Sequence, residues 1–345
     1  MLTKQTRNES KVIYLPPLIR SNIKPLLPFL ERPNLIEFSI NKPGEVFLLN
    51  YEGWTRHDAP DLDIDTLQFI GQTLATSSGQ LFNNENPILS CDMPGYGYRV
   101  EALMGAVADS GFCMSIRVGA AKRFPIDTYF NQGDCIEVVK AIAVKKNILI
   151  VGGTETGKTT FFNSLLRHFP KESRYVVIED VKELVVEQKN TVRLKVSRNG
   201  NGLTNTTYGQ IVESCKRLKP ERFLMGELGT ANTVPFIDLL NTGHSGSIST
   251  IHASATPSEA INAIRENAAR DGEKYPEIIA QNAIERIHYF VFLSRDESGK
   301  TRKYKAALVK NDPSFYKKKD VEASDQIAVQ IESLIRCLEK NVEVL

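Results

Sequence analysis

Alternating apolar and polar positions characterise the first part of the chain. In residues 35–50, LIEFSINKPGEVFLLN, the alternation continues on both sides of Lys42-Pro43-Gly44, which predicts a β-hairpin with a Pro-Gly turn. Apolar residues spaced at helical intervals from Ile64 to Leu74 predict a helix that ends near Gly79. Short stretches at 88–91, 97–102 and 113–118 predict three more strands. Strands and a helix in this mixture predict an α+β domain.

The later part of the chain has short continuous apolar runs that alternate with helical patterns. Strands are predicted at 147–151, 174–178, 223–227 and 288–294, and a further strand rich in small residues is predicted within 242–253. Helices are predicted at 158–168, 207–218, from a Thr256 capping box, and from residue 275 onward, and a hairpin turn is predicted at 295–303. This alternation predicts an α/β domain.

These patterns predict five consecutive parts. Residues 1–33 contain four prolines and form an N-terminal arm or a short broken helix, and 34–118 are the α+β domain. The small and basic stretch within 119–128 is a linker to the α/β domain at 129–312. Apolar residues at helical spacing within 321–345 predict a helical tail, 313–345.

The sequence GGTETGKTT, residues 152–160, contains the strongest chemical signal in the chain. It matches G-x-x-x-x-G-K-[ST] between a predicted strand and a predicted helix, the context of a phosphate-binding P-loop. Lys158 is predicted to contact the β- and γ-phosphates and Thr159 to bind Mg²⁺. The predicted nucleotide contacts of this loop are Gly153, Thr154, Glu155, Thr156, Gly157, Lys158, Thr159 and Thr160. A glycine-rich turn that binds nothing is the alternative, and the strand and helix on either side disfavour it.

Glu155 is unusual in such a loop, because a carboxylate opposes anion binding. We expect its side chain to turn away from the phosphates, toward solvent or a neighbouring chain.

Acidic residues follow two of the predicted strands. Glu179, Asp180 and Glu183 come at the carboxyl end of the strand at 174–178, where ligands bind in open α/β sheets. Glu227 ends the strand at 223–227, and an acid there holds Mg²⁺ through water or orients an attacking water. Asp180, Glu227 and Thr159 are therefore the predicted metal-site residues. A surface acidic turn is the alternative for the first group.

Two histidines and one arginine complete the candidate site. His244 and His252 lie on either side of a small-residue strand, without the spacing of a zinc site, and both are interpreted as γ-phosphate sensors. Arg117 ends a strand just before the linker, a position from which its guanidinium would reach a nucleotide in the second domain. A surface residue in a weak ion pair is the commoner role of such an arginine, and of Arg99.

Composition narrows the class of protein. The formal net charge of +2 is too small for a dedicated nucleic-acid binder, and five scattered cysteines suggest neither a disulfide framework nor a zinc site. The N-terminus is polar, and no run of about eighteen apolar residues occurs. We therefore expect a cytoplasmic protein with at most peripheral membrane association.

Four motifs together resemble one family. In order these are GGTETGKTT, the acidic box VVIEDVKEL, the Walker B stretch KPERFLMGEL and the histidine box TGHSGSISTIHA. They resemble the hexameric traffic ATPases of type IV secretion and conjugation systems, relatives of the pilus-motor and type II secretion ATPases. The segments INKPGEVFL, GYRVEAL and SIRV extend the resemblance over roughly residues 34–310.

The resemblance implies a RecA-like C-terminal ATPase domain behind the smaller α+β domain, a hexameric ring, and ATP with Mg²⁺ as cofactors. It implies that Glu183 and Glu227 polarise the attacking water, that His252 senses the γ-phosphate and that Arg117 contacts the nucleotide from the first domain. It also implies a location at the inner membrane, with other type IV secretion ATPases and membrane channel components as partners. No sequence-specific nucleic-acid binding is expected.

Three positions depart from the family pattern, and three alternative functions stay open. Glu155 stands where the family usually has Gly, Gly229 where it usually has Arg, and Lys219 where Arg is common. A GTPase is disfavoured because no guanine-reading motif follows the loop. A scaffold that binds ATP with negligible turnover remains possible because of Gly229. A DNA-translocating motor is disfavoured by the lack of a basic recognition helix.

Overall fold

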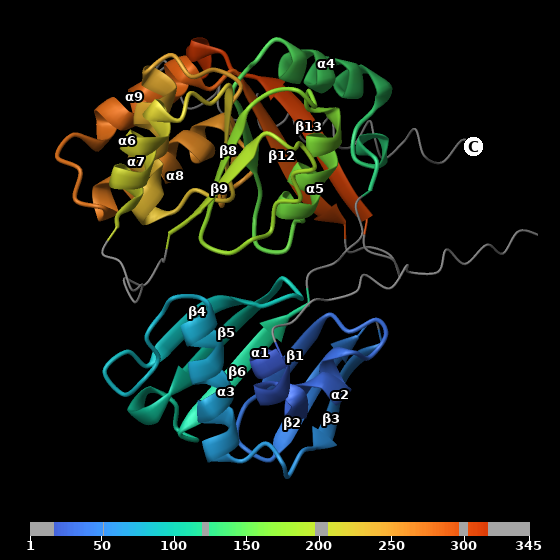
Figure 1. Cartoon of the computed structure of the whole chain (residues 1–345). Helices are drawn as coiled ribbons and strands as arrows, with labels where there is room; N and C mark the ends of the chain where they lie inside the picture. The colour runs from blue at the N-terminus through green and yellow to red at the C-terminus, as the bar shows by residue number, and fades with distance from the viewer. Residues whose placement is uncertain (1–16, 51, 119–123, 197–205, 297–302, 317–345) are drawn as a thin grey trace, which may run out of the picture. The chain divides into compact units, whose positions relative to one another are not determined.

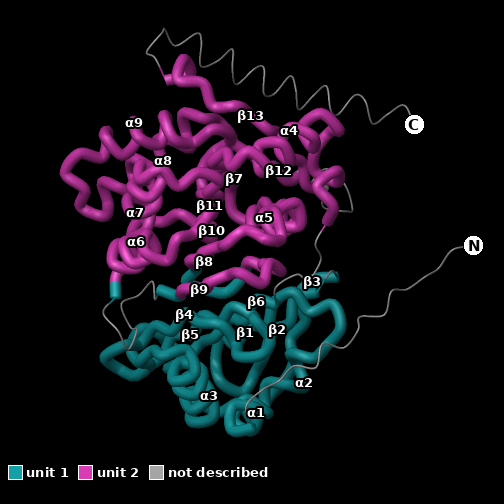
Figure 2. Tube along the Cα trace, turned by 45° about the horizontal axis from the view of Figure 1, so that its top comes forward, with its two compact units in different colours: residues 1–121, 179–183, 195–206 teal, residues 122–178, 184–194, 207–345 magenta. Residues whose placement is uncertain are grey.

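The computed structural model describes residues 17–50, 52–118, 124–196, 206–296 and 303–316. The chain divides into two compact units, shown in Figure 2. The first comprises residues 1–121, 179–183 and 195–206, and the second comprises 122–178, 184–194 and 207–345. The helix predicted at 321–345, the turn at Ser298-Gly299 and most of the predicted linker lie outside the described residues.

The first unit is built on a six-stranded sheet in the order β3-β2-β1-β6-β5-β4, in which every neighbouring pair is antiparallel (Figure 1). The strands are β1 (Glu37–Ile40), β2 (Glu45–Asn50), β3 (Gly53–Asp58), β4 (Ile88–Met93), β5 (Tyr98–Met104) and β6 (Phe112–Arg117). The predicted hairpin is confirmed as β1 and β2, which turn at Gly44 with φ +85°. β3 was not predicted.

Three helices pack with this sheet. They are α1 (Pro17–Asn22), α2 (Leu27–Leu30) and α3 (Ile64–Ser77), and the last confirms the predicted helix. α3 begins at Asp63, whose carboxylate accepts a hydrogen bond from the Thr66 N–H at 2.8 Å. Ile23, Leu26 and Leu30 are buried with the strand residues in one core. The described part of the predicted arm therefore contributes to the core of the first unit.

The second unit is built on a seven-stranded sheet in the order β13-β12-β7-β11-β10-β8-β9. β12, β7, β11, β10 and β8 run parallel, and β13 is antiparallel to β12. The strands are β7 (Ile148–Val151), β8 (Tyr175–Glu179), β9 (Thr191–Lys195), β10 (Arg222–Met225), β11 (Ile248–Ile251), β12 (Tyr289–Asp296) and β13 (Lys303–Lys310). Residues of β7, β8, β10 and β11 are buried throughout, which confirms continuous apolar runs as interior parallel strands.

Helices cover both faces of this sheet, as Figure 1 shows. α4 (Gln132–Ala143) and α5 (Lys158–Leu165) share one core with alternate residues of the strands. On the other face lie α6 (Tyr208–Arg217), α7 (Thr230–Asn241), α8 (Pro257–Arg270) and α9 (Pro276–Arg286). The predicted α/β fold with a preceding α+β unit is thereby confirmed.

Some predicted details differ from the structure. β10 ends at Met225, so Glu227 lies in the turn after the strand and not at its end. α6 buries Tyr208, Val212 and Cys215, and it ends at Arg217, one residue before the predicted end. α4, α7 and β9 were not predicted. Among the described residues, no helix has both the length and the apolar character required to cross a membrane.

Candidate nucleotide site

The loop at 152–157 joins the buried strand β7 to helix α5. β7 lies inside the sheet, with β11 and β12 parallel on either side, so the loop leaves the carboxyl edge of the sheet near its middle. Gly157, at the N-cap of α5, has φ +81°, a left-handed conformation that favours glycine. A Cβ on Gly152 would lie 2.5 Å from the Thr156 hydroxyl oxygen. Glycine is thus required at both ends of the loop.

Lys158 lies over this loop. Its ammonium donates to the carbonyls of Gly152 at 3.0 Å and Gly153 at 2.9 Å, and its side chain is 11% exposed. The Thr156 hydroxyl also donates to the Gly153 carbonyl, at 2.9 Å. The cationic group is therefore already placed at the mouth of the loop, where successive backbone N–H groups and the start of α5 favour an anion.

Glu227 lies beside Lys158, with 3.9 Å between Oε1 and Nζ. Hydrogen bonds to neighbouring elements hold the turn that carries it: the Leu228 N–H donates to the Thr250 carbonyl at 2.7 Å. The buried Asn232 of α7 accepts from the Gly229 N–H at 2.7 Å and donates to the Glu227 carbonyl at 2.9 Å. The backbone that follows this carboxylate is thereby fixed.

The three predicted metal-site residues are divided between the two compact units. Thr159, in the first turn of α5, and Glu227 belong to the second unit, whereas Asp180 is grouped with the first. In the described parts of the chain, no three His, Cys, Asp or Glu side chains form a cluster able to hold a metal. A hydroxyl and a carboxylate nevertheless suit Mg²⁺, which takes few protein oxygens and completes its shell with water and phosphate.

The two predicted sensor histidines lie at opposite edges of the sheet. His252 directly follows β11 and lines a cavity of about 340 Å³ together with Gly152 and Gly153. His244 precedes β11, where its ring lies against Phe223 and its Nδ1 is 2.9 Å from the Thr242 hydroxyl. Burial lowers the pKa of His244. Of the two, only His252 lines this cavity with the loop, so the predicted sensor role fits the geometry of His252 and not that of His244.

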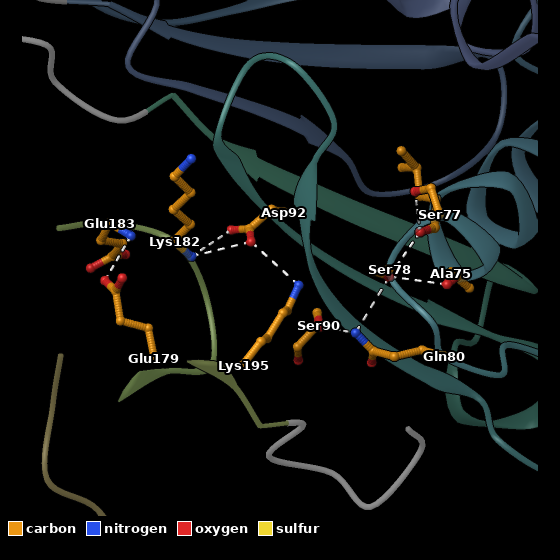
Figure 3. Close-up of polar contacts among 11 residues, drawn as sticks. Ala75, Ser77, Ser78, Gln80, Ser90, Asp92, Glu179, Lys182, Glu183 and Lys195 are labelled. Carbon is orange, nitrogen blue, oxygen red and sulfur yellow. Dashed lines mark hydrogen bonds and ion pairs between the residues drawn. The ribbon is translucent and has the colours of Figure 1, made fainter. Parts of the chain in front are cut away.

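The acidic box is held by residues of the first unit (Figure 3). Asp92 on β4 accepts from the Lys182 N–H through both carboxylate oxygens, at 3.0 and 3.1 Å, and pairs with Lys195 at 3.3 Å. The Glu183 N–H donates to Glu179 at 3.0 Å, and the Glu183 carboxylate pairs with Arg99 at 2.9 Å. The acidic segment is therefore held by several hydrogen bonds and ion pairs within the first unit, which a simple exposed surface turn would not require.

Arg117 is exposed at the end of β6. In the sheet it lies directly opposite Arg99 on β5 and Glu37 on β1, and Arg99 in turn lies opposite Asp92. The two arginines therefore stand side by side at one end of the first unit, within a row of charged residues that begins and ends with a carboxylate.

Glu155 is not simply turned toward solvent. Its carboxylate accepts a hydrogen bond from Arg295 Nη1 at 2.8 Å, and the backbone of Glu155 has φ +58°. Sequence reasoning missed Arg295, and also Asn232, because neither residue belongs to a motif. The only available signal was the unfavourable carboxylate itself, which required a cation from elsewhere in the chain.

Known proteins resemble this chain in sequence. A family model described as "Type II/IV secretion system protein" matches residues 110–267. The type IV secretion system protein VirB11 of Bartonella quintana is 31% identical over 275 residues, which cover 69% of this chain and 77% of that protein. Protein VirB11 of Rhizobium radiobacter is 29% identical over 267 residues, which cover 68% and 77% respectively.

Solved structures share the fold. The ATPase DotB of Legionella pneumophila superposes with a TM-score of 0.63 at 16% identity, covering 90% of this chain and 86% of that one. The pilus retraction motor PilT with bound ADP gives 0.56 at 15% identity, covering 93% and 88%. At such identities the likeness concerns the fold alone.

Proposed function

This chain belongs to the VirB11 family of type IV secretion system proteins, and we propose that it hydrolyses ATP at the loop 152–160 to drive such a system. The observation that carries this proposal is the position of Lys158, bonded to two loop carbonyls and 3.9 Å from the Glu227 carboxylate. The lysine that we propose to bind the phosphates and the carboxylate that we propose to orient the attacking water thus lie side by side in the second unit.

Each residue of the proposed site has a distinct task. Incoming phosphates take the Lys158 ammonium from the Gly152 and Gly153 carbonyls, and the loop N–H groups and the start of α5 bind the same anion. Glu227 orients water toward the γ-phosphorus, with Glu183 as the second acid. His252 contacts the γ-phosphate, and Arg117 reaches it from the first unit.

Mg²⁺ would be held by the Thr159 hydroxyl and the Glu227 carboxylate, with Asp180 as the further proposed ligand, and it would neutralise charge that develops on the phosphate oxygens. In this proposal ATP closes the two units and loss of the γ-phosphate releases them. Hydrolysis would thereby move each unit as a rigid body.

The finer assembly is also a proposal. We propose a homohexamer at the cytoplasmic side of the inner membrane, working with other type IV secretion ATPases and channel components on secretion, pilus assembly or conjugative transfer. The membership in a secretion family supports this setting. The scaffold alternative keeps one specific basis, Gly229, which offers no side chain after Glu227.

Two variants test the hydrolytic proposal. Lys158→Ala is expected to lose ATP binding, and Glu227→Gln to bind ATP but to hydrolyse it about a hundredfold or more slowly, the scale of a lost proton-transfer group. Steady-state phosphate release with ATP and with GTP, beside equilibrium nucleotide binding, measures both. Lys145→Gln, which removes a charge before β7 at the opposite edge of the sheet, is the matched control.

The outcomes separate the alternatives. Full turnover by Lys158→Ala would refute the assignment of the loop 152–160 as the phosphate site. Full turnover by Glu227→Gln would assign the orientation of the attacking water to Glu183 instead. Tight ATP binding with negligible wild-type turnover would favour the scaffold, and preferential GTP turnover the GTPase. Solution mass with and without ATP tests the ring, which a monomer in both conditions would exclude.

A further inference from the structure

The P-loop of this chain carries its own negative charge. Glu155 is 49% exposed in a left-handed backbone conformation, with φ +58°, that side chains rarely adopt. Its Oε2 is 2.8 Å from Arg295 Nη1, although 140 residues separate the two in sequence. Both the strained backbone and the unfavourable charge indicate that this contact has a purpose beyond a surface ion pair.

Strand pairing places Arg295 at the loop. β12 runs parallel to β7 up to the pair Phe292 and Val151, and Arg295 follows three residues later. Its direct partner on β13 is Tyr304, whose ring carbons lie 3.5 Å from where a Cβ on Gly157 would be. The hairpin of β12 and β13 therefore flanks the loop, and the Arg295 side chain, 19% exposed, is held there by the sheet.

Two cations, Lys158 and Arg295, and two carboxylates, Glu227 and Glu155, lie around the loop in close pairs. Lys158 supplies one cation over the Gly152 and Gly153 carbonyls. An uncompensated carboxylate three residues before it would repel the phosphates that Lys158 attracts, and because Glu155 is half exposed, added salt would weaken this repulsion. Arg295 supplies the compensating charge.

We propose that Arg295 is a positioning residue of the nucleotide site, which holds the Glu155 carboxylate toward β12 and cancels its charge so that the loop accepts a polyphosphate. This inference rests on the proposed function, since it concerns the same loop. It assigns a specific role to Glu155 and explains how the loop tolerates it.

The proposal is tested by a double-mutant cycle on nucleotide affinity. Wild type, Arg295→Gln, Glu155→Gln and the double variant are titrated with adenosine, ADP and ATP at low and high salt, with binding measured by calorimetry. Arg295→Gln is expected to weaken ATP binding roughly tenfold at low salt, ADP binding less, and adenosine binding hardly at all. Glu155→Gln is expected to tighten ATP binding, and in its presence Arg295→Gln is expected to lose most of its effect.

Controls separate charge from folding. Lys145→Gln removes the same charge at the opposite edge of the sheet and is expected to leave ATP affinity unchanged. Arg295→Lys, which keeps the charge, is expected to restore most of the affinity. If Arg295→Gln fails to fold, Glu155→Gln alone decides, because a weaker or unchanged ATP affinity in that variant contradicts the charge argument.

The results distinguish this inference from the proposed function. Wild-type protein without measurable ATP binding overturns both. Wild-type binding with an equal loss from Arg295→Gln in the presence and absence of Glu155→Gln overturns the inference alone, as does an equal loss for adenosine and ATP. Coupling that grows with the number of phosphates supports it.

Discussion

At the scale of single residues, two glycines near the site differ in what surrounds them. A Cβ on Gly152 would meet the Thr156 hydroxyl oxygen at 2.5 Å and the Leu293 carbonyl oxygen at 3.1 Å. A Cβ on Gly229 would meet nothing within 4 Å, and its φ of −133° is open to any residue. The surrounding atoms therefore leave no room for a side chain at Gly152, whereas a side chain at Gly229 would meet no steric hindrance.

We predict that Gly152→Ala weakens ATP binding by at least about tenfold, because the loop must shift away from the backbone of β12. Gly229→Ala is the matched control and is expected to bind ATP as the wild type does. Equilibrium titration with ATP measures both, and thermal melting of each variant confirms that it folds. Wild-type affinity in Gly152→Ala would show that the loop conformation described for this chain is not the one that binds.

Residue patterns predicted the strand, the loop and the helix that follows it because their signals are local. Lys158 and Thr159 follow a strand and open a helix, so their place is set within ten residues of sequence. The partner of Glu155 depends on the pairing of β12 with β7, which joins positions 140 residues apart. No local pattern contains that information, and the expectation that Glu155 faces solvent or another chain accordingly missed Arg295.

At the scale of elements, those with a clear apolar period were predictable and the others were not. β3 has the sequence GWTRHD and is largely exposed, so it lacks an alternating apolar signal. α7 contains Pro235, which argues against a helix interior when only sequence is considered. Packing of Phe236, Ile237 and Leu240 into the second unit stabilises that helix in spite of the proline.

Three strands of the second unit are joined at their amino ends by one residue. The Asn147 side chain accepts from the Ser247 N–H at 3.0 Å and donates to the Arg286 carbonyl at 2.8 Å. The backbone N–H of Asn147 donates to His288 Nδ1 at 3.1 Å. The His288 ring must therefore be unprotonated at Nδ1 in the folded chain. Burial, with Lys146 nearby, lowers the pKa of His288 below its ordinary 6.5.

We predict that the second unit loses stability as the pH falls below about 6.5, because the unfolded chain then binds a proton at His288 that the folded chain resists. A histidine whose pKa is lower in the folded chain than in the unfolded chain contributes its full stabilisation at pH values above the unfolded pKa. That contribution declines as the pH falls from the unfolded pKa to the folded pKa. Denaturant unfolding between pH 7.5 and pH 5 measures the effect.

His288→Asn is the control for that measurement, since its amide oxygen accepts the same hydrogen bond without titrating. The variant should show a shallower decline of unfolding free energy with falling pH. Burial also lowers the pKa of His168 and His244, so a residual slope is expected in both proteins. Identical slopes for wild type and variant would exclude His288 as a contributor.

At the scale of the whole molecule, each unit has a hydrophobic core of its own. Phe38, Leu67 and Phe112 belong to the core of the first unit, and Ile150, Phe161 and Leu224 to that of the second. Two separate cores predict two unfolding transitions. Trp54, the single tryptophan of the chain, lies on β3 of the first unit, and its fluorescence therefore identifies the transition of that unit.

The two separate cores offer a test of Arg117. This arginine and the acidic box are the parts of the proposed nucleotide site that belong to the first unit. A bound ligand stabilises whatever part of a protein holds it, by about 2.7 kcal/mol when present at a hundred times its Kd. With a non-hydrolysable ATP analogue, we predict that calorimetry shows a higher Tm for the second unit, and that Trp54 fluorescence shows a higher Tm for the first. Arg117→Gln should abolish the rise in Tm of the first unit and keep that of the second unit.

Lys42→Gln, which removes one exposed charge from the first unit, is the matched control and should keep both shifts. A shift confined to the second unit in the wild type would mean that Arg117 does not engage the nucleotide. If the shift of the first unit instead survives Arg117→Gln, the first unit responds to ATP through the acidic box, where Arg99 pairs with Glu183. Arg99→Gln, measured in the same way, would decide whether that ion pair transmits the effect.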